Sequence, residues 1–443
     1  MREKSLRSID WTAVIPGQGG GGQGKRVDGR RKGKIIGKVA IALAGLATAL
    51  TVAATPSGAV AQDIAVAPVH IPQTSDEALA QDASVYASRF GVTLAEAVAR
   101  LRALQASASF TDGIRERFHD RLVGISIDHA PVFRIVVLLT GGAPVAPTTI
   151  EAGRMILPVV FRTGASATGD DVIRAMLQRG PELDALLPGA RGMGLDARTG
   201  ELVILLRAAD AAQPDLNAVR DRAEQVAGVK IRFDTADQPA NLSLAGGARI
   251  EGVDPADGRR YACTTGFAVT DGARTGIATA AHCPDDVVFE DPDGGTIPLT
   301  FAGQWGARTQ DVQVNVSPVP QQPIFYADRH HGALRQLTGA RSRLSTRAGE
   351  WLCHYGESSG YSCAEVELTQ FAPPGQLCGG ACAPTWVTVR THDCHSGDSG
   401  GPVFSGTIAF GITKGGSGGR GTRCNFYFYM STDFLPAGWR LLR

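Results

Sequence analysis

The sequence predicts a chain of two structural classes, in which a region of alternating helices and strands precedes an all-β region. The length of 443 residues is enough for two or three domains. All eight cysteines fall between Cys263 and Cys424, so they belong to the second region. The low aromatic content and the 55 glycines are typical of a β protein built from small residues, joined here to an alanine-rich helical region. The net charge of +1 gives no reason to expect binding to nucleic acid or to a membrane surface.

The first 61 residues are predicted to be a signal peptide. Residues 1–38 are basic and form an unusually long n-region, residues 39–54 are apolar, and small residues lead to Ala61, after which we expect cleavage. An uncleaved membrane anchor is the alternative, although an apolar run of about 16 residues is short for a span of about 20. Export agrees with the even number of cysteines, which predicts disulfides.

A cysteine-free region with its own core is predicted for residues 62–244. Helices are expected at residues 75–90, 93–104, 170–179 and 215–227, and strands at 135–139, 201–206 and 229–233. Thr93 and Glu96 have the spacing of a capping box, and Leu94, Val98 and Leu101 form one apolar stripe. This pattern predicts a small α/β domain or a pair of such domains.

A candidate base and a candidate acid follow in the all-β region. Two short strands around the turn Asp271-Gly272 lead into Thr-Ala-Ala-His-Cys at residues 279–283, which places His282 just beyond a buried strand. Residues 310–316 alternate as a strand, and Asp311 lies at its start, where a carboxylate can face an imidazole. Competing acids lie in a turn-rich loop; they are Asp285, Asp286, Asp291 and Asp293.

A candidate nucleophile lies in the run Gly-Asp-Ser-Gly-Gly-Pro at residues 397–402, shortly after Cys394. Gly397 and Gly400 permit backbone conformations that a Cβ would hinder. The N–H groups of Gly397 and Ser399 can then converge on one point, as an oxyanion hole requires. A serine hydroxyl needs a base, and the base needs an orienting acid. The three motifs therefore predict His282, Asp311 and Ser399 as catalytic residues; a glycine-rich surface turn is the alternative for the loop taken alone.

In these motifs residues 245–443 resemble the chymotrypsin-like serine peptidases, most closely the bacterial streptogrisin and alpha-lytic protease branch. The matching pieces are Thr-Ala-Ala-His-Cys, Asp-Val-Gln-Val, Gly-Asp-Ser-Gly-Gly-Pro and a cysteine hairpin at residues 351–363. The resemblance implies an all-β fold of two six-stranded antiparallel β-barrels with the active site between them. It also implies that Asp398 is buried and paired with an internal arginine. The implied disulfides are Cys263–Cys283, Cys353–Cys363 and Cys394–Cys424, which leaves Cys378 with Cys382.

The region before the peptidase resembles a pro-region of the same branch, beginning with residues 82–101. Such pro-regions assist the folding of the peptidase and inhibit it until they are removed. The resemblance thus implies an α/β pro-region at residues 62–244 and a peptidase domain at 245–443. Residues 238–248 form a polar, flexible linker in which we expect cleavage near Leu244. An accessory domain that is kept is the alternative.

Two features depart from the family pattern near the expected substrate pocket. Lys414 stands where a serine is common, and its side chain either pairs with Asp311 or points to solvent. Asp393 stands roughly where a residue of the pocket floor belongs, which would favour arginine or lysine before the cleaved bond. Gly415 and Gly416 instead indicate an open pocket for large apolar or aromatic side chains. The sequence leaves both preferences open.

The sequence as a whole predicts a secreted or periplasmic serine endopeptidase that is made as a zymogen. Its expected partners are protein or peptide substrates and its own pro-region, and it is expected to be a monomer that binds no nucleic acid. The chemistry requires no metal or cofactor. The rival hypotheses are a catalytically impaired binding protein on a peptidase scaffold and a membrane-tethered periplasmic protease that retains its N-terminal domain.

Overall fold

The computed structural model describes residues 71–236, 239–241, 248–255, 257–290, 295–328, 332–391, 393–418 and 424–443. The predicted signal peptide and the expected cleavage point at Leu244 lie outside these residues. The chain divides into one unit of residues 1–66 and another of residues 67–443, and all described residues belong to the second.

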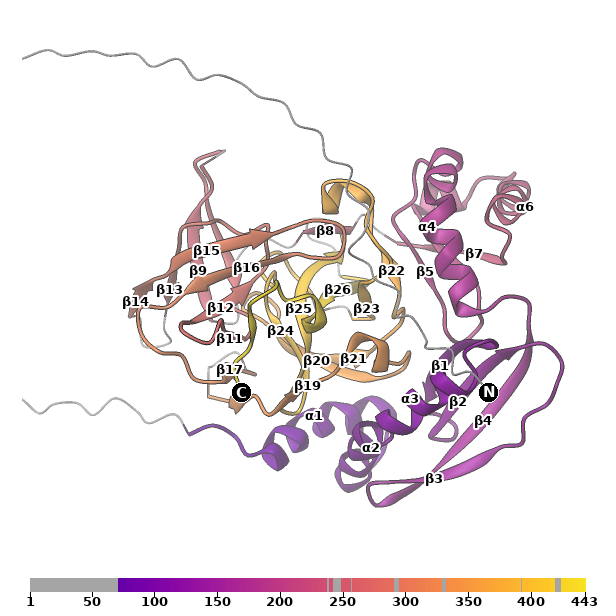
Figure 1. Cartoon of the computed structure of the whole chain (residues 1–443), viewed down its shortest axis with the longest axis horizontal. Coiled ribbons are helices and arrows are strands. Elements are labelled where there is room, and N and C mark those ends of the chain that lie inside the picture. The colour runs from indigo at the N-terminus through magenta and orange to yellow at the C-terminus, as the bar shows by residue number, and fades with distance from the viewer. Residues whose placement is uncertain are drawn as a thin grey trace, which may run out of the picture. The chain divides into compact units, whose positions relative to one another are not determined.

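Three helices open the described part of the chain: α1 (Ser75–Phe90), α2 (Leu94–Ala106) and α3 (Ala108–Arg117) (Figure 1). The predicted bounds of α1 are confirmed, because a full capping box of Thr74 and Glu77 starts it and a left-handed Gly91 ends it. The capping box predicted for α2 is wrong in part. The Thr93 hydroxyl accepts from the N–H of Glu96, but the Glu96 carboxylate bonds to Arg100. The sequence did not predict α3.

A four-stranded sheet packs against these helices. Its strands lie in the order β1-β2-β4-β3, and only β2 and β4 are parallel. Their bounds are β1 Leu122–Asp128, β2 Arg134–Thr140, β3 Thr148–Ala152 and β4 Met155–Ala165. Tyr86, Leu104, Ile125 and Ile135 share its core with Trp351, which belongs to the C-terminal region. The helical region and the C-terminal region therefore share one apolar core here.

A second α/β lobe follows, with helix α4 packed against α6 (Figure 1). Its helices are α4 (Gly169–Leu186), α5 (Ala208–Ala211) and α6 (Leu216–Ala227). Its strands are β5 (Met193–Leu195), β6 (Leu202–Leu206) and β7 (Ile231–Thr235). Helix α4 continues beyond the predicted end at Arg179 and includes Pro181. Strand β22 (Phe371–Ala372) of the C-terminal region joins this sheet beside β5.

The first half of the C-terminal region forms two antiparallel sheets. One has the order β10-β9-β13-β14, with bounds β9 Arg249–Val253, β10 Arg260–Thr264, β13 Val287–Glu290 and β14 Thr296–Pro298. The other has the order β15-β16-β12-β11-β27, with bounds β11 Ala268–Thr270, β12 Thr275–Thr279, β15 Thr300–Trp305, β16 Val312–Val316 and β27 Arg440–Leu441. The predicted hairpin around Asp271-Gly272 is confirmed as β11 and β12.

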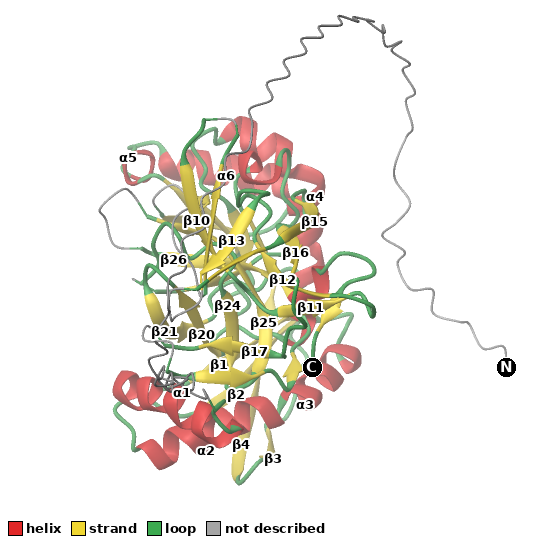
Figure 2. Cartoon of the chain, turned by 90° about the vertical axis from the view of Figure 1, so that its left-hand side faces the viewer, coloured by secondary structure: helices red, strands yellow, loops and turns green. Residues whose placement is uncertain are grey.

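The second half forms a sheet with the path β21-β20-β24-β25-β26-β23, which β19 and β8 join at β25. The bounds are β8 Pro239–Asn241, β19 Gly339–Ala340, β20 Trp351–Gly356, β21 Gly360–Glu365, β23 Val387–Val389, β24 Pro402–Ser405, β25 Ile408–Ser417 and β26 Phe426–Ser431. A separate pair is β17 (Ile324–Tyr326) with β18 (Leu334–Gln336). The region is mostly β (Figure 2), and the finer prediction of two six-stranded barrels stays a prediction.

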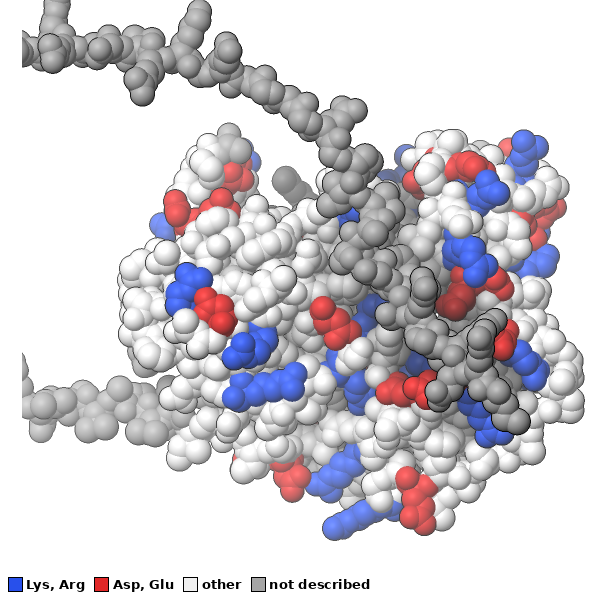
Figure 3. All heavy atoms as spheres, in the orientation of Figure 1, with Lys and Arg blue, Asp and Glu red and all other residues white. Residues whose placement is uncertain are grey.

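Basic and acidic side chains alternate over the face drawn in Figure 3, in agreement with the net charge of +1. No helix among the described residues combines the length and the apolar character that crossing a membrane requires.

Candidate active site

His282 and Asp311 meet because the strands that carry them are neighbours. Strands β12 and β16 pair antiparallel, with Thr279 opposite Gln313. His282 follows the end of β12 and Asp311 precedes the start of β16, so both lie at the same edge of the sheet. The Nδ1 atom of His282 is 2.8 Å from Oδ2 of Asp311, to which it donates.

Ser399 reaches the same imidazole from the second half of the C-terminal region, whose sheet contains β24. It lies in the loop before β24, and its Oγ donates to Nε2 of His282 over 2.7 Å. Ser399 is fully buried and Asp311 is 2% exposed. The structure thus brings the three predicted catalytic residues into one hydrogen-bonded chain, from Asp311 through His282 to Ser399.

The Ser399 loop requires glycine at position 400. Gly400 has a φ of 85°, and a Cβ there would clash with the main-chain oxygen of Thr264 and the hydroxyl of Thr279. Thr264 also holds the loop, because its N–H donates to the Ser399 carbonyl (2.7 Å) and its hydroxyl to the Gly397 carbonyl (2.9 Å). Sequence reasoning missed Thr264, whose only local signal is its place directly after Cys263.

Within residues 397–401, the N–H groups of Gly397 and Ser399 have no bonded acceptor among the described residues. The N–H groups of Asp398, Gly400 and Gly401 each donate to a main-chain carbonyl instead. Gly397 has a φ of 116°, which an L side chain rarely adopts. The two predicted oxyanion donors are therefore the amides that the fold leaves available beside Ser399.

Asp398 is fully buried, as predicted, but its observed partners differ from the expected arginine. Its two carboxylate oxygens accept from the N–H groups of Ser359 (3.1 Å) and His395 (2.7 Å). Among the described residues, no arginine or lysine forms an ion pair with it. Main-chain donors satisfy a buried carboxylate without a second charge, so no internal arginine is required.

The acid of this cluster is ionised despite its burial. Burial acts to raise the pKa of Asp311, but the nearby His282 and the ammonium of Lys414 outweigh it and lower the pKa to about 2. The competing Asp285 and Asp286 are exposed, whereas Asp291 and Asp293 lie outside the described residues. Asp311 is thus the carboxylate that the structure places against the imidazole.

The expected pocket residues divide into two groups. Gly415 and Gly416 are buried on β25, beside Lys414, whose carbonyl oxygen is 3.5 Å from Ser399 Oγ. Asp393, by contrast, has an exposed side chain, and its main-chain carbonyl accepts from Nε2 of His354 (3.0 Å). A pocket floor is enclosed, so this placement does not support Asp393 as the floor.

Four disulfides are present, and their pairing is the one that the resemblance implied: Cys263–Cys283, Cys353–Cys363, Cys378–Cys382 and Cys394–Cys424. The first fixes the residue after His282. The last ties the start of the Ser399 loop to the segment that enters β26. No cysteine of the described residues is free.

No family model matches the chain. Streptogrisin-C from Streptomyces griseus is 30% identical over 184 residues, which are 40% of this chain and 36% of that protein. Serine protease 1 from Streptomyces fradiae is 26% identical over 298 residues, which are 64% of this chain and 78% of that protein. The chain thus spans well under half the length of streptogrisin-C. The predicted resemblance to serine proteases of this kind is confirmed.

Two of the similar solved structures are Thermobifida fusca protease A and the chymotrypsin of Cellulomonas bogoriensis. The first is 23% identical with a TM-score of 0.35, over 45% of this chain and 98% of that chain. The second is 24% identical with a TM-score of 0.33, over 45% of this chain and 98% of that chain.

Proposed function

We propose that this chain, a relative of the chymotrypsin-like serine peptidases, is a secreted serine endopeptidase made as a zymogen. The observation that carries the proposal is the hydrogen-bonded chain from Asp311 through His282 to Ser399. A buried hydroxyl bonded to an imidazole, which is itself oriented by a buried carboxylate, is the arrangement that makes serine a nucleophile.

Acylation begins when Ser399 Oγ attacks the carbonyl carbon of the peptide bond and its proton passes to Nε2 of His282. Negative charge develops on the former carbonyl oxygen, and the N–H groups of Gly397 and Ser399 are available to donate to it. Each such donor is worth roughly 10²–10³ in rate. Asp311 stabilises the imidazolium and holds Nδ1–H toward itself.

The end of acylation and the deacylation that follows both move protons through the same imidazole. The C–N bond breaks as His282 gives its proton to the leaving amine, which leaves an ester between the acyl group and Ser399. Water then attacks the ester carbon while His282 accepts the water proton. The acid product departs when Ser399 regains its proton, so the site returns to its starting state.

The zymogen state is supported by strand β8, which ends the N-terminal region. Pro239–Asn241 pair antiparallel with Gly415–Ser417 of β25, directly after Lys414. Extended peptides bind proteins by adding a strand to a sheet edge in this way. Residues 239–241, expected to be part of a flexible linker, are thus a strand paired with the β25 segment that follows Lys414. A substrate peptide that adds to this segment of β25 would be excluded by them.

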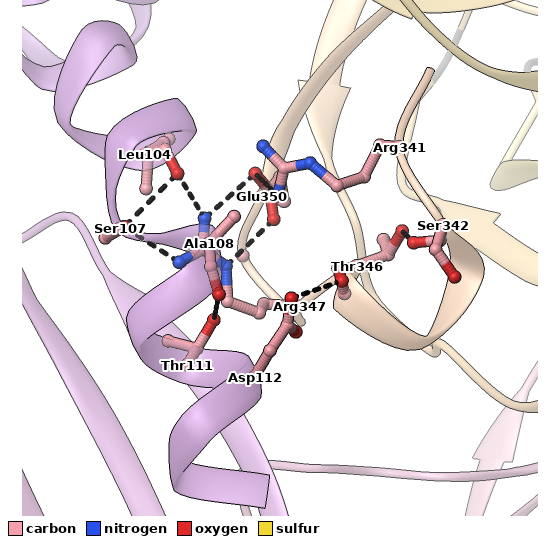
Figure 4. A network of polar contacts seen from close by, with 12 residues as sticks. Leu104, Ser107, Ala108, Thr111, Asp112, Arg341, Ser342, Thr346, Arg347 and Glu350 are labelled. Atoms are coloured by element: carbon pink, nitrogen blue, oxygen red, sulfur yellow. Dashed lines mark hydrogen bonds and ion pairs between the residues drawn. The ribbon is translucent and has the colours of Figure 1, made fainter.

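A buried arginine supports the hypothesis that the N-terminal region assists folding (Figure 4). Arg347 of the peptidase region donates to the Leu104 carbonyl (2.6 Å) and to the Ser107 hydroxyl (2.9 Å), at the C-terminal end of α2. The same guanidinium pairs with Glu350 at 3.0 Å. A cation at a helix C-terminus is favourable, and here it joins the two regions through fully buried groups.

A fluorophosphonate probe tests the catalytic part of the proposal. Matured protein should be labelled and should hydrolyse peptides, and Ser399→Ala should lose both properties. Ser396→Ala is the matched control, since it removes an exposed hydroxyl from the same loop. Absence of labelling in wild-type protein would favour the impaired binding protein.

N-terminal sequencing of the secreted product tests the zymogen part. We expect a new N-terminus near Leu244 in wild-type protein and an uncut linker in Ser399→Ala. A secreted or tethered product that keeps residues 62–244 while active would contradict the pro-region hypothesis.

A further inference from the structure

Lys414 is a buried cation whose charged end contacts the candidate catalytic acid. Its side chain is 3% exposed, and Nζ lies 3.3 Å from Oδ2 of Asp311. The ammonium also lies over the ring of Trp386, 5.2 Å from its centre. A lysine is rarely buried unless it is paired, and Asp311 with the aromatic face provides that pairing.

One carboxylate oxygen serves two donors in this cluster. The same Oδ2 of Asp311 that accepts from His282 at 2.8 Å also faces the ammonium of Lys414. Among the described residues, His282 and Lys414 are the charged or titratable groups that act on Asp311, from the end of β12 and from β25 respectively. The N–H of Asp311 faces Sδ of Met430, which is neutral.

Lys414 does not compete with His282 for the proton of Ser399. The Ser399 hydroxyl donates to Nε2 of His282 at 2.7 Å, whereas the part of Lys414 near Ser399 Oγ is its main-chain carbonyl. The ammonium is turned toward Asp311 instead. Any effect of Lys414 on the reaction must therefore act through the carboxylate and the imidazole.

We infer that Lys414 is a positioning residue that compensates the negative charge of Asp311. It thereby extends the pH range of hydrolysis to lower pH. This inference rests on the proposed peptidase function. A carboxylate that is compensated by an ammonium on the same oxygen gives less stabilisation to an imidazolium. With Lys414 present, His282 then remains able to act as a base at a lower pH than it would if an uncharged side chain stood at position 414. The same weaker stabilisation makes it a weaker base, which lowers the maximal rate.

The pH profile of kcat/KM tests the inference. Lys414→Met removes the charge and keeps most of the side chain, so the acid limb should move to higher pH by about one unit, the size that one nearby charge produces. Lys414→Ser should move it in the same direction, and Lys414→Arg, which restores the charge, should not. Identical acid limbs for Lys414→Met, Lys414→Ser and wild type would overturn the inference.

Arg341→Met is the matched control. Arg341 is also a mostly buried cation that pairs with a carboxylate, Glu350 at 3.4 Å, and lies over an aromatic ring, that of Phe410. Its removal should leave the acid limb where it is. A shift as large as that of Lys414→Met would mean that general loosening of the fold moves the limb.

An NMR titration of the His282 ring in the full-length Ser399→Ala protein separates the inference from the proposed function. Lys414→Met should raise the pH at which this ring gains its proton, with no need for turnover. A raised midpoint together with no hydrolysis by wild-type protein would defeat the proposed function alone. An unchanged midpoint with normal hydrolysis would defeat the inference about Lys414 alone.

Discussion

The buried carboxylate of Asp82 should be a major contributor to the stability of the unprocessed chain. Asp82 lies on α1, and Arg335 lies on β18 of the C-terminal region; both are fully buried. Oδ1 of Asp82 is 2.9 Å from Arg335 and accepts from the hydroxyl of Tyr361 (2.7 Å), and Oδ2 accepts from the N–H of Gly406 (2.6 Å). One guanidinium and two hydrogen-bond donors therefore converge on one carboxylate at the junction of the two regions.

Asp82→Asn removes the charge and presents an NH₂ group to these donors. Breaking a buried ion pair from one side destabilises by about 3–5 kcal/mol, because the remaining charge stays buried without compensation. Urea unfolding of the full chain, carried in the Ser399→Ala background to prevent cleavage, should show this loss as a lower midpoint. A loss of pairing alone should leave the slope of free energy against urea unchanged.

Asp76→Asn is the matched control, since Asp76 lies on the same helix and pairs with Arg102 at 2.8 Å. Its side chain is 82% exposed, and exposed pairs contribute less than about 1 kcal/mol. Equal effects of the two substitutions would refute the reasoning. So would full suppression of the Asp82→Asn effect by high salt, because salt screens exposed pairs much more than buried ones.

Three further outcomes are expected. Burial lowers the pKa of His129 from 6.5, so below about that pH the folded chain binds fewer protons than the unfolded chain. The urea midpoint of the full chain should therefore fall as the solution is acidified. The variant His129→Gln should show a flatter decline. Gly400→Ala should abolish hydrolysis while the four disulfides still form, as thiol alkylation and mass spectrometry would report, because the loop has no room for a Cβ. Arg347→Met should lower the stability of the full chain by about 3 kcal/mol in urea unfolding, because the buried carboxylate of Glu350 then loses its Arg347 partner. Arg207 is exposed, so Arg207→Met should change the stability little.

Local signals predicted the elements whose ends are set by nearby residues. Helix α1 matched its predicted bounds because its caps, Thr74 and Gly91, are local chemistry. Helix α4 extends past Arg179 because packing of its apolar face, not the local sequence, decides its length. The sheet of β1 to β4 was predicted only at β2, since a strand needs partners that are distant in the sequence.

The sequence by itself determined the identity and order of the chemical groups: His282, then Asp311, then Ser399 with its glycines, together with an even set of cysteines. The spacing of residues within a motif is set by the covalent chain, so it is known from the sequence without the fold. Only the tertiary structure decided how distant segments meet. It turned Lys414 toward Asp311 instead of solvent, exposed Asp393, and gave Asp398 two main-chain donors in place of an arginine. These outcomes depend on which donor or opposite charge lies next to each buried charged group. Those neighbours come from distant strands and are therefore decided only by the assembled fold.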